Sequence, residues 1–120
     1  MGNREIKFKV WDGVDYMSSP FTLQDLQDKK VQFTSDCKVM QFTGRKDKKL
    51  NPIYEGDILK FRSGMLGVVV FDNLEVEIEQ ETYECLCFCI KVKDFVCAIE
   101  GTDEIIGNVF LNPELLKQTP

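Results

Sequence analysis

Histidine is absent from the 120 residues of this chain, which removes the commonest general base and the commonest metal ligand. The sequence also lacks a glycine-rich phosphate loop and a nucleophile elbow. No apolar run approaches the roughly 20 residues that a membrane-spanning helix needs, and the first ten residues contain no signal-peptide core. We therefore expect a cytoplasmic protein that is not an enzyme and carries no cofactor.

Cysteine is present in an odd number, five, which does not suit a framework of disulfides. Cys85, Cys87 and Cys89 are spaced by two, so their side chains share one face of a strand. Structural zinc sites use a wider Cys-x₂₋₄-Cys spacing. We expect reduced thiols that act as small apolar residues, which again favours the cytoplasm.

Charge is unevenly divided along the chain, although the net charge is only −5. Residues 1–65 contain 12 Lys and Arg against 9 Asp and Glu, a balance of +3. Residues 66–120 contain 3 against 11, a balance of −8. Asymmetry of this kind can mark a partner surface.

Apolar residues recur with a period of two through much of the chain, which predicts strands. Thr22 and Asp25 are typical of the start of a short helix, which we expect over 21–30. Asn112-Pro113 is typical of the start of a second one, which we expect over 113–117. Asp72-Asn73 predicts a hairpin turn. The strands are expected near 5–11, 31–33, 38–42, 58–61, 66–71, 75–79, 83–92 and 105–111.

These short strands and their Gly, Asp and Asn turns predict a single, mostly β domain with two short helices. We expect a small, partly open SH3-like barrel built from residues 54–111, within a core region of 53–112. The preceding region, 1–52, would pack a strand and a helix against it. Residues 113–120 would form the short C-terminal helix.

Two carboxylates flank Gly56, and Glu55 and Asp57 are the one candidate acid/base or metal-binding pair. A tight turn explains them better, because no histidine or third ligand lies near. Gly56 can adopt the positive φ that such a turn needs.

Two charged segments are candidate partner-binding surfaces. The first is basic and could contact phosphates, or be a solvated loop; it contains Arg45, Lys46, Lys48 and Lys49. The pI of about 4.8 disfavours general nucleic-acid binding. The second is an acidic strand face with Glu75, Glu77 and Glu79, followed by Glu81. It could mimic nucleic-acid phosphates, be a solvated face, or meet the basic loop of a neighbouring subunit.

Three blocks of sequence resemble the YopX family of phage and prophage proteins. They are Arg4–Asp12, the stretch from Met40 to Ile58, and the stretch from Ile105 to Leu116. The blocks occur in the family's order and spacing over nearly the whole chain, while 66–101 shows no family pattern. The resemblance implies a phage-derived protein of β-rich fold in a bacterial cytoplasm. It implies no established activity.

The function expected from these features is a self-associating module that binds a host or phage protein. Tyr83–Val92 is apolar on both faces, and such a strand lies inside a fold or in an interface. The alternative is a nucleic-acid-binding accessory protein that uses 45–49. An enzyme based on Glu55 and Asp57 comes third. We expect no membrane partner.

Overall fold

Antiparallel strands make up most of the computed structural model, which describes residues 6–14, 16–30, 36–93 and 95–118. The strands are β1 (Phe8–Trp11), β2 (Lys38–Lys46), β3 (Pro52–Tyr54), β4 (Asp57–Lys60), β5 (Leu66–Ile78), β6 (Glu81–Val92), β7 (Phe95–Cys97) and β8 (Glu104–Asn108). The helices are α1 (Leu23–Gln27) and a 3₁₀ helix, Pro113–Gln118. The predicted strand near 31–33 lies outside the described residues.

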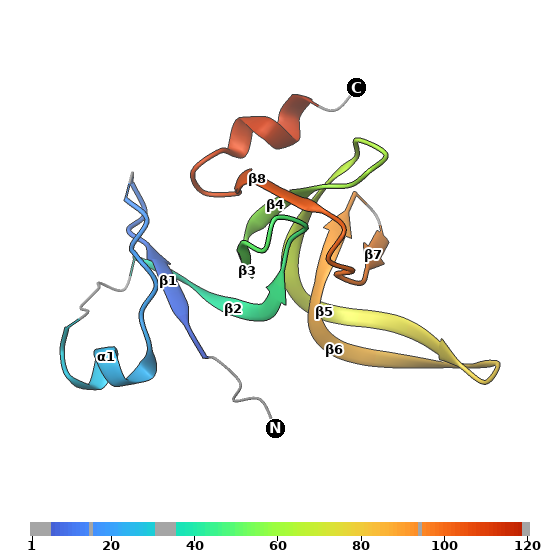
Figure 1. The fold of residues 1–120 in the computed structure, drawn as a ribbon, viewed down its shortest axis with the longest axis horizontal. Helices are drawn as coiled ribbons and strands as arrows, with labels where there is room; N and C mark the ends of the chain where they lie inside the picture. The colour runs from blue at the N-terminus through green and yellow to red at the C-terminus, as the bar shows by residue number, and fades with distance from the viewer. Residues whose placement is uncertain (1–5, 15, 31–35, 94, 119–120) are drawn as a thin grey trace.

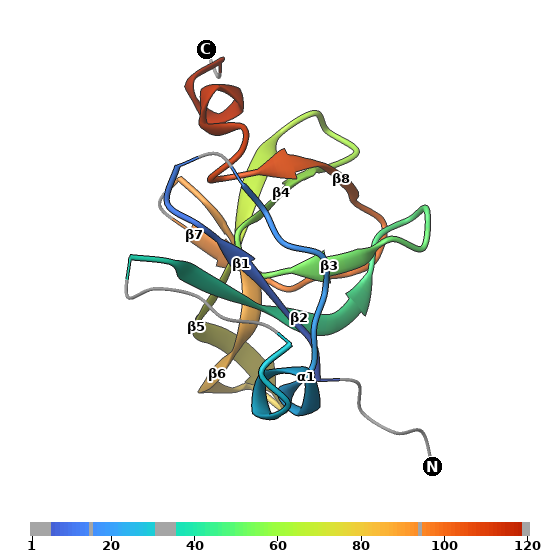
Figure 2. The ribbon, with the colours of Figure 1, turned by 90° about the vertical axis from the view of Figure 1, so that its left-hand side faces the viewer.

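Two sheets organise the molecule, one of order β1-β2-β3 and one of order β7-β6-β5-β4-β8. The predicted β-rich fold is confirmed, and within the described residues the sheets form no closed barrel. The first sheet and α1 lie on one side of the second sheet, and the 3₁₀ helix lies at the end far from α1 (Figures 1 and 2). No helix in the described part of the chain is long and apolar enough to span a membrane.

A small apolar core lies on one side of the five-stranded sheet. Val69 and Ile90 are directly opposite each other on β5 and β6, and both are buried there. The cluster comprises Ile53, Leu59, Val69, Ile90, Val92 and Ile99. Trp11 packs elsewhere, stacked on Phe110 at a centroid distance of 6.1 Å, as expected of a core residue. The core therefore stabilises the base of the β5–β6 hairpin and leaves its far end outside.

The short helix α1 begins as predicted at Thr22. The Thr22 hydroxyl accepts from the Asp25 amide at 3.2 Å, and the Asp25 carboxylate accepts from the Thr22 amide at 3.0 Å. This capping box satisfies two amides that the first turn leaves without partners. The helix spans five residues rather than the ten expected, because it buries no apolar side chain that would extend it.

The predicted turn at Asp72-Asn73 is wrong. Strand β5 continues through it to Ile78, and Asp72 is directly opposite Cys87. The chain reverses instead at Glu79 and Gln80, whose φ angles are +50° and +72°. Two consecutive left-handed residues match the twist of a hairpin, although asparagine and glycine are the usual residues there. The result is one long hairpin instead of two short ones.

The far half of this hairpin projects from the body as a two-stranded ribbon (Figure 1). We call residues 71–88 the arm. The radius of gyration is 15.5 Å, above the roughly 13.6 Å expected for a compact chain of this length. Side chains along the arm are mostly exposed, in contrast to those at its base.

Candidate partner-binding surface

The acidic Gly56 corner is a structural turn. The buried carboxylate of Asp57 accepts from the Tyr54 amide at 2.8 Å and from the Asn108 side chain at 3.3 Å. Gly56 has a φ of +89°, as the turn requires. The Glu55 carboxylate accepts from the Gln41 amide at 3.4 Å. Both members of the candidate acid/base pair therefore bind backbone amides of their own chain.

The basic segment is divided by the structure into two unlike pairs. Lys48 and Lys49 both form ion pairs with Glu104 at the start of β8. The hydrogen bond and charge of Glu104 raise the pKa of Lys49, and the same contact lowers the pKa of Glu104. Arg45 and Lys46 belong to the end of β2, are exposed, and form no ion pair with any residue that the structure describes. Among the described residues, Arg45 and Lys46 are therefore the cations of this segment that no carboxylate contacts.

Asp47 fixes the loop between these two pairs. One carboxylate oxygen accepts from the amides of Lys49 at 2.9 Å and Asn51 at 2.8 Å, and the other accepts from the Ile105 amide at 3.0 Å. Burial raises the pKa of Asp47, but the amides of Ile105, Asn51 and Lys49 outweigh burial, so the pKa lies below its usual value. This bond could not be predicted from sequence, because Ile105 is 58 residues away from Asp47.

We expect acid to act on the two buried aspartates in opposite directions. Burial raises the pKa of Asp57 above its usual 3.8, against the bonds from Tyr54 and Asn108. The Asp57 carboxylate therefore binds a proton more readily in the native state than in the unfolded state. The free-energy cost of burying this carboxylate in its charged form is relieved as the pH falls from 7 towards 3.8. The lowered pKa of Asp47 stabilises the fold above 3.8, and this contribution is lost as the pH falls further.

Urea unfolding of the parent, Asp57→Asn and Asp47→Asn between pH 7 and pH 3 measures both effects. As the pH falls from 7 to 4, the free energy of unfolding of the parent should rise relative to that of Asp57→Asn. As the pH falls below 3.8, the free energy of unfolding of the parent should fall relative to that of Asp47→Asn. A difference between the parent and Asp57→Asn that stays constant from pH 7 to pH 4 would contradict the assigned burial effect.

The acidic residues of the arm occupy two faces and a turn, not the single face that was predicted. Glu75 and Glu77 share one face, and Glu79 lies in the turn. Glu81 is opposite Ile78 on the other face. The sequence prediction missed Glu84, which stands directly opposite Glu75. The turn position determines this pairing, so the misplaced turn concealed it.

The three cysteines of β6 share one face of the strand, as predicted, but they are buried to different extents. Cys89 is buried and Cys85 is exposed, so the expectation of three buried thiols fails at Cys85. Burial is the main cause that raises the pKa of both Cys87 and Cys89. Among the described residues, no group of three or more Cys, Asp or Glu side chains is placed to hold a metal ion.

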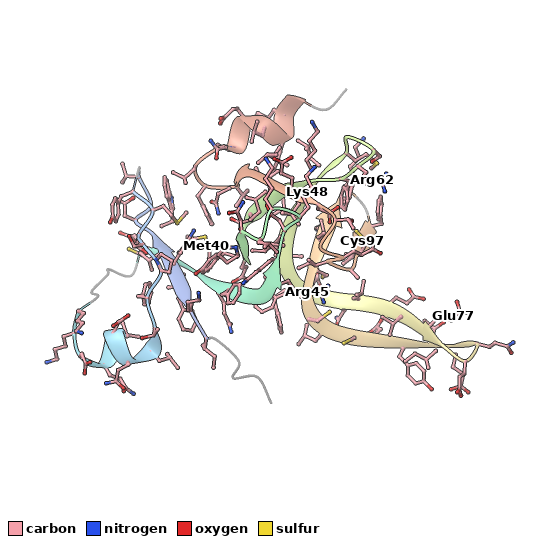
Figure 3. All side chains as sticks on the ribbon, viewed as in Figure 1. Met40, Arg45, Lys48, Arg62, Glu77 and Cys97 are labelled. Carbon is pink, nitrogen blue, oxygen red and sulfur yellow. The ribbon has the colours of Figure 1, made fainter. Side chains whose placement is uncertain are left out.

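Apolar side chains gather where the arm leaves the body. Phe71 and Phe88 are opposite each other, with ring centroids 4.9 Å apart in an edge-on arrangement. Phe71 is 49% exposed, and Leu86, two pairs further along and on the same face, is 61% exposed. These three side chains, with Ile6, Phe42 and Arg45, line a hollow of about 560 Å³. Figure 3 shows Arg45 at the arm's base and Glu77 towards its free end.

A second groove of about 660 Å³ lies at the opposite end of the hairpin. It is lined by the β4–β5 turn, by Lys91 of β6, by Lys93 just after that strand, and by Leu116 of the 3₁₀ helix. None of the partner-binding residues predicted from sequence lines it.

The family model for YopX proteins matches residues 6–117. The chain belongs to the YopX family. The resemblance seen in the sequence is therefore confirmed, and it extends through the middle segment, where no family pattern was evident. No curated protein matches the chain. One similar solved structure is the crystal structure of protein EF1440 from Enterococcus faecalis. It is 20% identical, the match covers 95% of this chain and 99% of that one, and the TM-score is 0.53. At that identity the likeness concerns the fold alone.

Proposed function

We propose that this YopX-family protein is a non-enzymatic assembly module that binds protein, including further copies of itself, through the β5–β6 arm. The observation that carries the proposal is the arm's exposure. An isolated two-stranded hairpin is at best marginally stable in water. Here such a hairpin projects from the body and exposes large apolar side chains, including Phe71, Ile78, Tyr83 and Leu86. A partner that covers them would stabilise the arm.

The charges near the arm support a protein partner over a nucleic acid. Lys48 and Lys49 are already in contact with Glu104, and within the described residues Arg45 and Lys46 are the two cations of the predicted basic segment that form no ion pair. From the hollow outwards, the arm carries the exposed Glu75, Glu77 and Glu84. A nucleic acid that followed the arm would meet these carboxylates, which repel a phosphate backbone. A protein surface can carry charges of either sign.

The non-enzymatic part of the proposal is supported by the carboxylates that were the best catalytic candidates. Asp57 and Glu55 accept hydrogen bonds from backbone amides in a tight turn. We further propose that the protein is phage-derived and works in a bacterial cytoplasm, where its five free cysteines would stay reduced.

Light scattering at micromolar concentrations tests the proposal. We expect a mass above the 13.8 kDa of one chain, and a mass that falls on dilution. A strict monomer over the whole range would contradict self-association. Binding to single-stranded DNA that weakens steeply with salt, and is lost in Arg45→Ala/Lys46→Ala, would favour the nucleic-acid alternative instead.

A further inference from the structure

The face of the arm that carries Phe71 follows a simple order from base to tip. Directly opposite residues of an antiparallel pair lie on the same face, and so do residues two apart on one strand. From the body outwards the cross-strand pairs are Phe71–Phe88, Asn73–Leu86, Glu75–Glu84 and Glu77–Thr82. At about 3.3 Å per residue, Glu75 lies roughly 13 Å beyond Phe71. We call this surface the junction face.

Positive charge stands at the other end of the junction face. Arg45 lines the hollow together with Phe71, Leu86 and Phe88, and so it lies on the body side of the apolar pairs. The surface therefore runs from a cation, through an apolar centre, to a group of carboxylates. The centre is well exposed, since 49% of Phe71 and 61% of Leu86 face solvent.

Both charged ends lack compensation within the described part of the chain. Arg45 has no carboxylate partner there. Glu75 and Glu84 have no cation and stand directly opposite each other, which is unfavourable for like charges in a sheet. A second surface that brought a cation to Glu75 and Glu84, and a carboxylate to Arg45, would satisfy all three groups.

We propose that this second surface is the junction face of another copy, in a two-fold symmetric dimer. This inference rests on the self-association proposed above and specifies its geometry. With the two arms antiparallel and an axis near the Asn73–Leu86 pair, Leu86 of one copy packs on Leu86 of the other. The same axis brings Arg45 of each copy to Glu75 and Glu84 of the other. A surface whose two ends have opposite charge is self-complementary about such an axis, as a closed two-fold interface requires.

The opposite face of the arm is less suited to this pairing. It carries Leu74, Val76, Ile78 and Tyr83, and its exposed cation is Lys91, opposite Val68. The Glu81 carboxylate near the tip of this face already accepts a hydrogen bond from the Tyr83 hydroxyl at 2.7 Å. Docking of one copy's arm into another's groove beside Lys91 and Lys93 would be head to tail and would extend beyond two copies. The junction face combines both charges with an apolar centre, and at neither end does a charge form an ion pair with a described residue.

Charge reversal tests the pairing. We expect self-association to weaken at least tenfold in each of two variants, Arg45→Glu and Glu75→Lys/Glu84→Lys. In a homodimer of either variant, residue 45 of each copy meets residues 75 and 84 of the other with the same sign of charge. An equimolar mixture of the two variants should form a complex of two chains, measured by light scattering. In that complex one of the two charge contacts is native and the other has both of its charges reversed, so both are attractive. Glu79→Lys/Glu81→Lys is the matched control, since these residues lie in the turn and on the other face, and it should associate normally.

Three results would overturn the pairing and leave the proposed function standing. The first is a parent that associates while the junction-face variants behave like the control. The second is a mixture that stays dissociated, and the third is a mixture that grows beyond two chains. A parent that is monomeric at every concentration would overturn both proposals. Circular dichroism of each variant verifies that the sheets remain folded.

Discussion

Replacing Asp47 by alanine is expected to destabilise the fold by about 3 kcal/mol, since three partly buried amides lose their acceptor and each such loss costs about 1 kcal/mol, the lower end of the range for buried groups. The carboxylate accepts from three amides and is only 2% exposed. One of those amides, that of Ile105, belongs to β8, so the change also removes one of the bonds that join the loop to the five-stranded sheet. Urea unfolding followed by circular dichroism measures the loss.

Asp47→Asn is the matched control for this change. Its single carbonyl oxygen can still accept from Lys49 and Asn51, and only the bond from Ile105 is lost. We expect a cost of about 1–2 kcal/mol. Equal stability losses in the alanine and asparagine variants would show that the loop amides find other acceptors, and the assigned contribution of Asp47 would be wrong.

The second large effect is expected at Gly67, where β5 crosses the core. A Cβ atom there would overlap Ile90 Cγ2 and would lie 2.9 Å from Val92 Cγ2. Both neighbours are β-branched core residues that cannot rotate away, so Gly67→Ala should cost about 3 kcal/mol through overpacking. Thermal unfolding compares this variant with the parent.

Gly64→Ala separates packing from backbone strain. Gly64 has a φ of +93°, but a Cβ atom there would have nothing within 4 Å. We expect a cost of about 1 kcal/mol from the left-handed backbone alone. If Gly67→Ala proved no more damaging than Gly64→Ala, then the core would be looser around β5 than the contacts indicate.

Local signals in the sequence predicted the local features of this fold. Thr22 and Asp25 located the helix start, and Gly56 located the acidic corner, because capping and turn chemistry depend on neighbouring residues. The turn at Glu79 and Gln80 was missed because neither residue is typical of a left-handed turn. That single error divided one long hairpin into two and concealed the arm.

The partner-binding residues were predicted in part, for a related reason. Composition located the charges at 45–49 and 75–79. It could not show that Lys48 and Lys49 are paired with Glu104, because that contact joins segments more than 50 residues apart. Nor could it place Glu84 beside Glu75, which needs the register of β5 on β6. Long-range pairing therefore decides which charges are available to a partner.

Concentration-dependent hydrogen–deuterium exchange tests most directly the claim that the arm is an interaction surface. Amides in a projecting two-stranded ribbon should exchange quickly in a dilute sample, because local opening of such a ribbon costs little free energy. At high concentration, we expect exchange across 71–78 and 81–88 to slow, while exchange in the core around Val69 and Ile90 stays unchanged. Exchange in the arm that is the same at every concentration would contradict the account.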